Sequence, residues 1–166
     1  MHSPTSRLAV MPTSQVEVRS ATTDEIPQLV DAYQWLFAPP GGTPDDWDPK
    51  TAADRIARTL AGPGSSLLVA VENNEVVGFC TMYLDLESVR FGQRCWVEDL
   101  AVHPERRSAG SGAALLKAAW QWAAAHGASH LELESGTTRV DAHRFYDRHQ
   151  PATRAVTFGW RSAPQA

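Results

Sequence analysis

Two neighbouring stretches decide the fold of this chain: Cys95-Trp96-Val97-Glu98-Asp99-Leu100-Ala101-Val102-His103-Pro104 and Arg107-Ser108-Ala109-Gly110-Ser111-Gly112. The first predicts a strand that ends in a sharp turn, and the second predicts a glycine-bearing loop before an alanine-rich helix. Free backbone N–H groups and the positive end of the helix dipole meet there and suit a phosphate. Gly110 and Gly112 lack the Cβ atoms that would keep an anion from the backbone, and Arg107 adds a positive charge.

Length and composition indicate one globular domain. Of the 166 residues, 43% are hydrophobic and 20% are charged, which is typical of a folded domain rather than a disordered or membrane protein. We expect a flexible tail at residues 1–14 and a single domain at residues 15–166. The formal net charge of -4 argues against a general nucleic-acid binder. No apolar segment resembles a signal peptide or a membrane span, so we expect a cytoplasmic protein without a membrane partner.

The two cysteines, Cys80 and Cys95, each fall inside an expected strand. We expect two buried free thiols, with a disulfide between them as the alternative. Neither cysteine has an identifiable partner base, which argues against a covalent acyl-enzyme. No Cys and His spacing typical of a metal site occurs, and no metal is expected.

Hydrophobic periodicity and turn signals place the secondary structure. Strands are expected at residues 15–20, 66–72, 75–84, 94–102, 130–135 and 155–160, and helices at residues 23–37, 51–60, 111–126 and 140–149. Asn73-Asn74 predicts a tight hairpin turn, and a second hairpin is expected around Phe91-Gly92. The order β-α-α-β-β-β-α-β-α-β indicates a mixed α/β (α+β) domain whose helices pack over a largely antiparallel central sheet.

The chain resembles the GNAT superfamily of acyl-CoA-dependent N-acetyltransferases from about residue 16 to residue 160. The family signature (Arg/Gln)-x-x-Gly-x-(Gly/Ala) is matched by Arg107, Gly110 and Gly112. A strand and a Val-x-Pro turn precede the match, an Ala-Leu-Leu helix follows it, and a later helix carries Ala142-x-x-x-Tyr146. The resemblance implies a GNAT-like fold, with acetyl-CoA as co-substrate and no metal.

The resemblance also implies where acetyl-CoA would bind. The N–H groups of residues 108–112 would hold its pyrophosphate, and the strand edge at residues 100–102 would pair with the pantetheine amides, which need partners. A backbone N–H near the thioester could stabilise the developing oxyanion. The CoA-binding residues expected on this basis are Leu100, Ala101, Val102, Arg107, Ser108, Ala109, Gly110, Ser111 and Gly112.

Acetyl transfer requires a neutral amine, whereas a free alkyl amine is mostly protonated at neutral pH. A carboxylate on the central strand can take that proton, directly or through water. Glu98 and Asp99 are the candidates, and they point to opposite faces unless a bulge intervenes. We expect Glu98 to be the base, with a cap or surface ion pair as the alternative for either residue. The resemblance assigns protonation of the departing thiolate to Tyr146, whose alternative is a helix tyrosine with a buried ring.

The chain departs from the family pattern on either side of that tyrosine. Arg139 stands where many members carry an asparagine, and Gln150-Pro151 replaces a Gly-Phe. We expect Arg139 either to meet a CoA phosphate or to be a plain surface arginine.

The acceptor pocket in this family commonly uses the first two helices and their connection, here residues 35–47. The acidic loop Asp45-Asp46-Trp47-Asp48 suits a cationic amine, and an ordinary solvated loop is the alternative. The acceptor-binding residues expected are Trp35, Asp46, Trp47 and Asp99.

The leading hypothesis is therefore an acetyl-CoA-dependent N-acetyltransferase that acts on a small-molecule or peptide amine by direct attack in a ternary complex. A non-catalytic acyl-CoA sensor or interaction module is the alternative. Other nucleotide-binding folds are disfavoured because their glycine-rich motifs are missing. Family analogy implies a homodimer, for which the expected strand ending in Phe158-Gly159-Trp160 is a candidate contact. Burial of that strand in its own sheet is the alternative.

Overall fold

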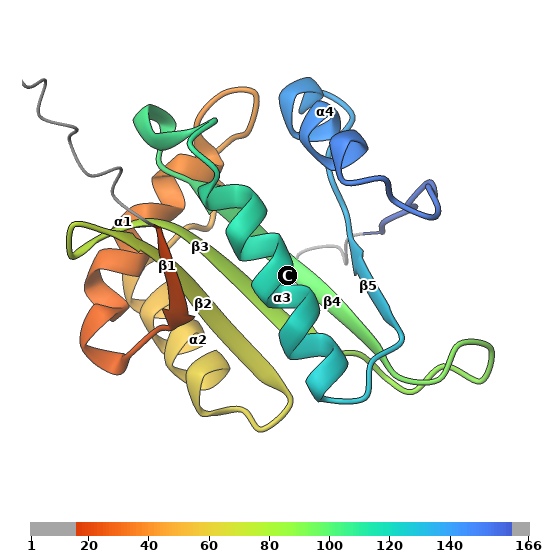
Figure 1. The fold of residues 1–166 in the computed structure, drawn as a ribbon. Helices are drawn as coiled ribbons and strands as arrows, with labels where there is room; N and C mark the ends of the chain where they lie inside the picture. The colour runs from red at the N-terminus through yellow and green to blue at the C-terminus, as the bar shows by residue number, and fades with distance from the viewer. Residues whose placement is uncertain (1–15, 161–166) are drawn as a thin grey trace, which may run out of the picture.

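Helices cover both faces of one sheet in the computed structural model, which describes residues 16–160 (Figure 1). The strands are β1 (Glu17–Ser20), β2 (Ser65–Glu72), β3 (Glu75–Leu84), β4 (Arg94–Val102) and β5 (His130–Leu133). The helices are α1 (Ile26–Phe37), α2 (Pro49–Ala61), α3 (Ser111–Ala125) and α4 (Val140–Arg148), with the short 3-10 helices η1 (Thr23–Glu25) and η2 (Pro104–Arg106). Among the described residues, no helix has both the length and the apolar character needed to cross a bilayer.

The five strands follow one another in the sheet in chain order, β1-β2-β3-β4-β5. Each pair is antiparallel except β4 with β5, which is parallel. A parallel pair needs a crossover connection, and α3 provides it. The mixed, largely antiparallel α/β architecture predicted from the sequence is confirmed.

Local signals in the sequence fix where the first two helices begin. Thr22 and Glu25 form a capping box ahead of α1, and the Glu25 carboxylate also binds Arg19 at 2.7 Å. The Asp48 carboxylate accepts the backbone N–H of Thr51 at 2.7 Å, so that α2 begins at Pro49, two residues before the predicted start. This cap explains the difference, because proline is favoured in the first turn of a helix.

The sheet separates two apolar cores. On one face, α1 and α2 pack against β2 and β3, with Leu29, Ile56 and Phe79 at the centre. On the other face, α3 packs through Leu115 against the same strands. A Cβ at Gly78 of β3 would lie 3.0 Å from both the Ala101 carbonyl oxygen and the Leu115 side chain, so glycine permits this close packing.

A β-bulge divides β4 into two segments. Thr81 of β3 pairs with Asp99, and the next residue, Met82, pairs with Val97, so Glu98 is the extra residue. Val97 packs into the α3 core, whereas Ala101 packs into the α1–α2 core. The bulge therefore shifts which face each side chain of β4 occupies beyond Glu98.

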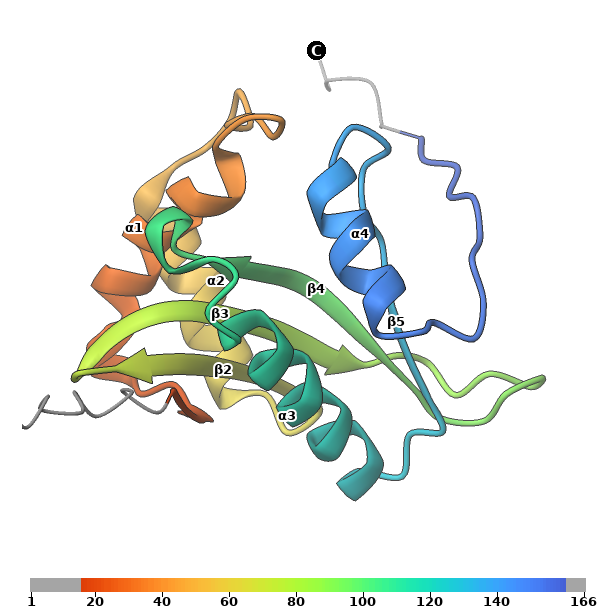
Figure 2. The ribbon, with the colours of Figure 1, turned by 45° about the horizontal axis from the view of Figure 1, so that its top comes forward.

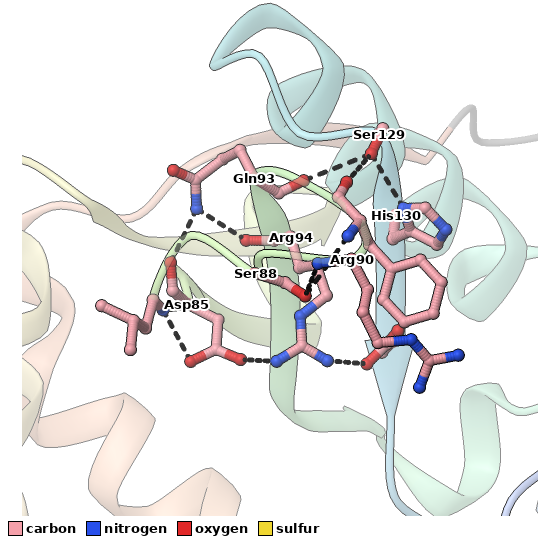
Figure 3. A network of polar contacts seen from close by, with 10 residues as sticks. Asp85, Ser88, Arg90, Gln93, Arg94, Ser129 and His130 are labelled. Atoms are coloured by element: carbon pink, nitrogen blue, oxygen red, sulfur yellow. Dashed lines mark hydrogen bonds and ion pairs between the residues drawn. The ribbon is translucent and has the colours of Figure 1, made fainter.

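Strands β4 and β5 pair at one end and then diverge (Figure 2). Their pairing runs from Arg94 with His130 to Val97 with Leu133, where β5 ends. At the paired end the Arg94 guanidinium donates to Asp85 at 2.5 Å and to Glu132 at 3.1 Å, within a wider polar network that ties the loop after β3 to β5 (Figure 3). Beyond Val97, residues 99–102 of β4 keep their β3 partners, and none of residues 98–102 has a β5 partner.

The predicted strand at residues 155–160 is wrong, because these residues have no regular secondary structure and are exposed. After α4 the chain turns at Gln150, which has a positive φ of 53°, and at Pro151. Apolar and polar residues alternate in the segment, but a strand also needs a neighbour to pair with, and residues 155–160 have none within the described chain. The alternating pattern of residues 155–160 therefore predicts a strand without showing whether a partner strand exists.

Cys80 and Cys95 are both free and buried, as predicted. The Asn73-Asn74 hairpin is also confirmed, with φ values of 51° and 65° at the two asparagines. The tail expected at residues 1–14 lies outside the described residues.

Candidate active site

A cavity of about 320 Å³ opens between α1, α2 and the middle of strands β3 and β4. Its wall combines aromatic, hydroxyl-bearing and charged side chains. The lining residues are Tyr33, Trp47, Ala52, Arg55, Ile56, Thr59, Ser65, Thr81, Met82, Tyr83, Glu98 and Asp99. Both candidate bases from the sequence are among them.

The bulge brings Glu98 and Asp99 into this one cavity. Neighbouring residues of a regular strand point to opposite faces, and the extra residue at the bulge removes that alternation. The sequence left open whether a bulge changes the alternation of the two acids, and the structure has such a bulge at Glu98. Two carboxylates therefore face the same small volume.

Two hydroxyl groups hold Asp99 in place. Its Oδ2 atom accepts from the Tyr33 phenol at 2.8 Å and from the Thr81 hydroxyl at 3.2 Å, and its backbone N–H donates to Thr81 at 3.0 Å. Burial raises the pKa of the Asp99 carboxyl, and the two hydroxyl groups oppose that rise. The Oδ1 atom is left as the oxygen with which Asp99 can bind a substrate amine.

Glu98 is more exposed than Asp99 and is held less tightly. Its Oε2 atom accepts from the Trp96 indole N–H at 3.1 Å. Partial burial, followed by the nearby Asp99 charge, raises the pKa of the Glu98 carboxyl above its ordinary value. A carboxylate with a raised pKa is a stronger base, which suits proton transfer from an amine.

Aromatic rings form the wall of the cavity on the helical side. The Tyr33 ring lies 5.0 Å from that of Phe79 and 5.5 Å from that of Trp47. Of the predicted acceptor-binding residues, Trp47 and Asp99 line the cavity, whereas Trp35 and Asp46 do not. Trp35 packs against Phe79 and His103 instead.

The residues of the acidic loop that was expected to attract an amine do not act together, because they lie in different places. Asp48 caps α2, and Trp47 turns into the cavity. Asp45 and Asp46 are exposed and line a separate hollow formed by residues 42–46 of their own loop. The acidic charge in the cavity itself therefore comes from β4 rather than from this loop.

The glycine-bearing loop before α3 presents a row of free donors. Within the described residues, the backbone N–H groups of residues 108–113 form no hydrogen bond to a protein acceptor, and the first helical bond begins at Ala114, which donates to Gly110 at 2.9 Å. Gly110 has a φ of 97°, a conformation that favours glycine. Six neighbouring N–H groups at a helix N-terminus fit a pyrophosphate.

This loop follows the end of β4 at which β4 and β5 are no longer paired. Among the described residues, no strand pairs with residues 98–102 on the side that β5 would occupy, and such an edge fits an extended ligand that carries amides. Helix α4 stands beside this opening (Figure 2) and carries the half-buried Tyr146. Burial raises the pKa of the Tyr146 phenol, so this group holds its proton at neutral pH. A Cβ at Gly112 would lie 3.4 Å from the Phe145 ring, so α3 and α4 meet closely here.

Arg107 and Arg139, both expected to contact CoA, bind the C-terminal end of α1. Arg139 donates to the Leu36 carbonyl at 2.8 Å. Arg107 donates to the Trp35 carbonyl at 3.4 Å and to the Val102 carbonyl at 3.3 Å. Helix α1 is thereby joined to the glycine-bearing loop and to α4, and cations at this end also complement the helix dipole. A contact of either arginine with CoA stays a prediction.

The cavity residues that sequence reasoning missed include four with polar side chains that face the acids or a ligand: Tyr33, Arg55, Thr81 and Tyr83. Tyr33 lies on the apolar face of α1, where a tyrosine reads as core. Thr81 and Tyr83 lie on one face of β3, but only the pairing of Thr81 with Asp99 reveals the hydroxyl beside the acid. Arg55 follows the buried Ala52 of α2 by three residues and directly precedes the buried Ile56, and this place at the border of the buried stripe is the signal that could have found it.

The two cysteines are poor nucleophiles. Burial raises the pKa of Cys80 to about 12 and that of Cys95 to about 11. The thiolate is the reactive form of cysteine, and at neutral pH neither side chain provides it in quantity. This agrees with the expectation that the chemistry does not pass through cysteine.

Comparison with known proteins identifies the family to which this chain belongs. Residues 27–150 match the acetyltransferase (GNAT) family. The chain is 31% identical over 121 residues to the uncharacterized N-acetyltransferase YhdJ of Bacillus subtilis strain 168, an alignment that covers 72% of this chain and 84% of that protein. It is 30% identical over 132 residues to the aminoalkylphosphonate N-acetyltransferase of Salmonella typhimurium strain LT2, covering 80% of this chain and 82% of that protein.

A solved structure shares the fold. The aminoglycoside N-acetyltransferase AAC(6')-Iy in complex with CoA superposes with a TM-score of 0.78 at 12% identity, covering 93% of this chain and 99% of that chain. At this identity the likeness concerns the fold alone. The family match and the two relatives together assign the activity: this chain belongs to the GNAT family of acetyltransferases and is an N-acetyltransferase.

Proposed function

We propose that the protein transfers an acetyl group from acetyl-CoA to a primary amine by direct attack, with both substrates bound at once. The observation that carries the proposal is the position of Glu98 and Asp99 in the cavity, at the point where β4 loses its β5 partner. The cavity would hold the amine, and the unpaired β4 edge would hold the pantetheine amides. The amine nitrogen and the thioester carbonyl would then meet at the bulge.

The protein groups around this point match the needs of the reaction. Asp99 would hold the ammonium form of the amine through its free carboxylate oxygen, and Glu98 would accept the proton that must leave before attack. A C–N bond then forms at the thioester carbonyl carbon while the C–S bond breaks. A free N–H on the β4 edge would stabilise the oxyanion, and the Tyr146 hydroxyl would give its proton to the departing CoA sulfur.

The acceptor is proposed to be a small amine. A cavity of about 320 Å³ lies at the lower end of the range typical of small-molecule sites. The relative from Salmonella typhimurium is named for an aminoalkylphosphonate acceptor, which is a small amine. A peptide amine that inserts only its terminus is the wider alternative.

Release of free CoA thiol from acetyl-CoA across a panel of amines tests the proposal. Wild type should turn over one class of amine, and Tyr146→Phe should lower kcat by about 10- to 1,000-fold because the general acid is lost. CoA affinity, measured by calorimetry, should remain within about twofold of wild type in this variant, since only the phenolic proton is removed.

The same assay separates the enzyme from the acyl-CoA sensor. Gly110→Val should abolish CoA binding under both hypotheses, because valine cannot adopt a φ of 97° without strain. Tight acetyl-CoA binding without thiol release from any amine would favour the sensor. Equal turnover by wild type and Tyr146→Phe would remove Tyr146 from the mechanism.

We also propose that the protein forms a homodimer through residues 155–160. Val156, Phe158 and Trp160 are each at least 75% exposed, and apolar side chains gathered on a short segment are typical of a contact surface. Within the described residues, β5 is an edge strand with β4 as its one neighbour. An edge strand offers backbone groups to which such a segment could pair.

A further inference from the structure

The cavity carries a positive charge that acetyl transfer to a simple amine does not require. Arg55 belongs to the wall formed by α2, whereas Glu98 and Asp99 belong to the wall formed by β4. Ala52, Arg55, Ile56 and Thr59 share one face of α2, because residues three and four apart on a helix are neighbours. The cavity is therefore acidic on one wall and basic on another.

The Arg55 guanidinium has no partner among the described residues. No hydrogen bond or ion pair to it occurs there, whereas Arg19, Arg94 and Arg106 each bind a carboxylate. Arg58 and Arg148 also lack partners in this part of the chain, but neither lines the cavity. Glu98 and Asp99 share the cavity with Arg55 but are engaged by Trp96, Tyr33 and Thr81.

Four of the five hydroxyl groups that line the cavity give their protons to protein acceptors. Tyr33 and Thr81 donate to Asp99, Thr59 donates to the Arg55 carbonyl, and Ser65 donates to the Thr59 carbonyl. Among the lining side chains, only Arg55, Tyr83 and Trp47 keep a donor without a partner in the described chain. The donors left for a ligand thus include a full positive charge, which suits an anionic group.

From this arrangement we infer that the acceptor is a primary amine that also carries an anionic group, a carboxylate or a phosphonate, which binds Arg55 while the amine faces Glu98 and Asp99. The inference rests on the proposed function, because it names the substrate class of the same site. A purely cationic polyamine meets repulsion from Arg55, and a neutral amine gains no attraction from the guanidinium, which stays exposed to solvent. Arg55 would then be the residue that determines specificity.

Matched amines test the charge requirement. We would compare kcat/KM for γ-aminobutyrate, β-alanine and aminoethylphosphonate with that for γ-aminobutyramide and putrescine, whose second groups are neutral and cationic. At least one anionic amine should exceed the neutral and cationic compounds by about 10- to 100-fold, which is the effect of one charged hydrogen bond. Turnover of the amide or of putrescine at a rate equal to or above the best anionic amine would overturn the inference but support the proposed function.

Variants on α2 test the residue. Arg55→Ala should lower the ratio of kcat/KM for the preferred anionic amine to that for γ-aminobutyramide by about 10-fold or more. Arg55→Glu should shift the preference toward putrescine. Arg58→Ala, which removes the same charge from the same helix outside the cavity, should leave this ratio unchanged. Equal effects of Arg55→Ala and Arg58→Ala would overturn the inference.

A binding measurement tests the anion site at Arg55 separately from the proposed acetyl transfer. The same anionic amines would be titrated by calorimetry into the CoA-loaded protein, for wild type, Arg55→Ala and Arg58→Ala. A dissociation constant raised about 10-fold or more by Arg55→Ala alone supports the anion site even if no amine is acetylated, a result that would count against the proposed function only. Absence of binding by every anionic amine to wild type would overturn the anion site.

Discussion

Asp99 lies in the cavity wall, and its buried negative charge lowers the stability of the fold. Its carboxylate is largely buried, and burial raises its pKa, so the ionised form is disfavoured inside the protein. A carboxyl whose pKa is higher in the folded than in the unfolded protein stabilises the fold when protonated. That stabilisation is lost as the pH rises through the folded-state pKa. At neutral pH the negative charge of Asp99 therefore opposes folding, whereas in the proposed function the same charge would hold the substrate amine.

Asp99→Asn should separate these two effects. The amide oxygen can still accept from Tyr33 and Thr81, so the free energy of unfolding at pH 7 should equal or exceed that of wild type. The kcat/KM for the amine should fall by about 10- to 100-fold, because the ammonium group loses its anionic partner. Urea unfolding and the thiol-release assay measure the two quantities.

Two further variants serve as controls for that prediction. Asp99→Ala should lose about 1–3 kcal/mol of stability, since two buried hydroxyl groups lose their acceptor. Asp46→Asn, on the exposed loop outside the cavity, should change neither stability nor kcat/KM. A marked loss of stability in Asp99→Asn would mean that its charge stabilises the fold.

At the residue scale, the sequence predicts which residues can do chemistry better than which of them meet. Glu98 and Asp99 stand out as acids on a central strand, but their common orientation depends on a one-residue bulge that the pattern of β4 does not reveal. Tyr33 lies 66 positions before Asp99, and their hydrogen bond exists only once α1 packs on the sheet. Arg55 reads as a solvated helix charge for the same reason.

At the element scale, α1 is held at its start by an ion pair. The bidentate contact of Arg19 with Glu25, at 2.7 and 3.0 Å, joins β1 to the first turn of the helical segment. The Glu25 carboxylate also accepts the Thr22 backbone N–H at 2.8 Å. The bond to Arg19 above all lowers the pKa of Glu25 to about 2. A lowered pKa stabilises the fold above the unfolded-state value and loses that effect as the pH falls toward 2.

Glu25→Gln should destabilise the protein by about 1 kcal/mol at pH 7, a modest value because Arg19 is partly exposed to solvent. The difference between wild type and variant should shrink as the pH falls from about 4.5, the usual range of a free glutamate, toward 2. Urea unfolding at several pH values measures it. Glu87→Gln, on the exposed loop after β3, should show no such dependence. A difference that is constant with pH would exclude the ion pair as its source.

Elements that carry their own start and stop signals are the ones that the sequence predicts well. Helix α3 begins after Gly110 and ends before Gly127, close to the predicted bounds. Helix α2 begins at Pro49 because Asp48 caps it, a signal that is present in the sequence but lies in a stretch whose composition favours an acidic loop. The segment at residues 155–160 carries the alternation of a strand, yet pairing is a property of two segments, so alternation alone cannot predict it.

At the scale of the whole molecule, helices on both faces of one sheet border the cavity and the unpaired edge of β4. Helices α1 and α2 border the cavity, and α3 and α4 border the loop and the β4 edge (Figure 1). Arg107 and Arg139 connect these halves by binding carbonyls at the end of α1. The layered architecture follows from the predicted order of elements, whereas these connections follow from packing and could not be predicted.

The assembly of the molecule can be tested through its C-terminal segment. We expect wild type to be a dimer by light scattering and Phe158→Ser with Trp160→Ser to shift it toward monomer, because the exposed apolar surface of the segment is lost. Val89→Ser, a fully exposed apolar residue of the loop after β3, is the matched control and should leave the mass unchanged. A monomeric wild type at micromolar concentration would exclude this interface.

The bulge at Glu98 has a consequence for which changes of length β4 tolerates. Loss of one residue from the middle of a strand normally turns every later side chain to the wrong face. In β4 the opposite holds, because Glu98 has no counterpart on β3, and its deletion would bring Asp99 directly after Val97 in unbroken pairing. Both cores would keep their side chains, and the cavity would lose one of its two acids. Glu98 is thus a residue that the sheet can lose without a change of register, so its deletion would remove an acid from the cavity and leave the pairing of β3 with β4 intact.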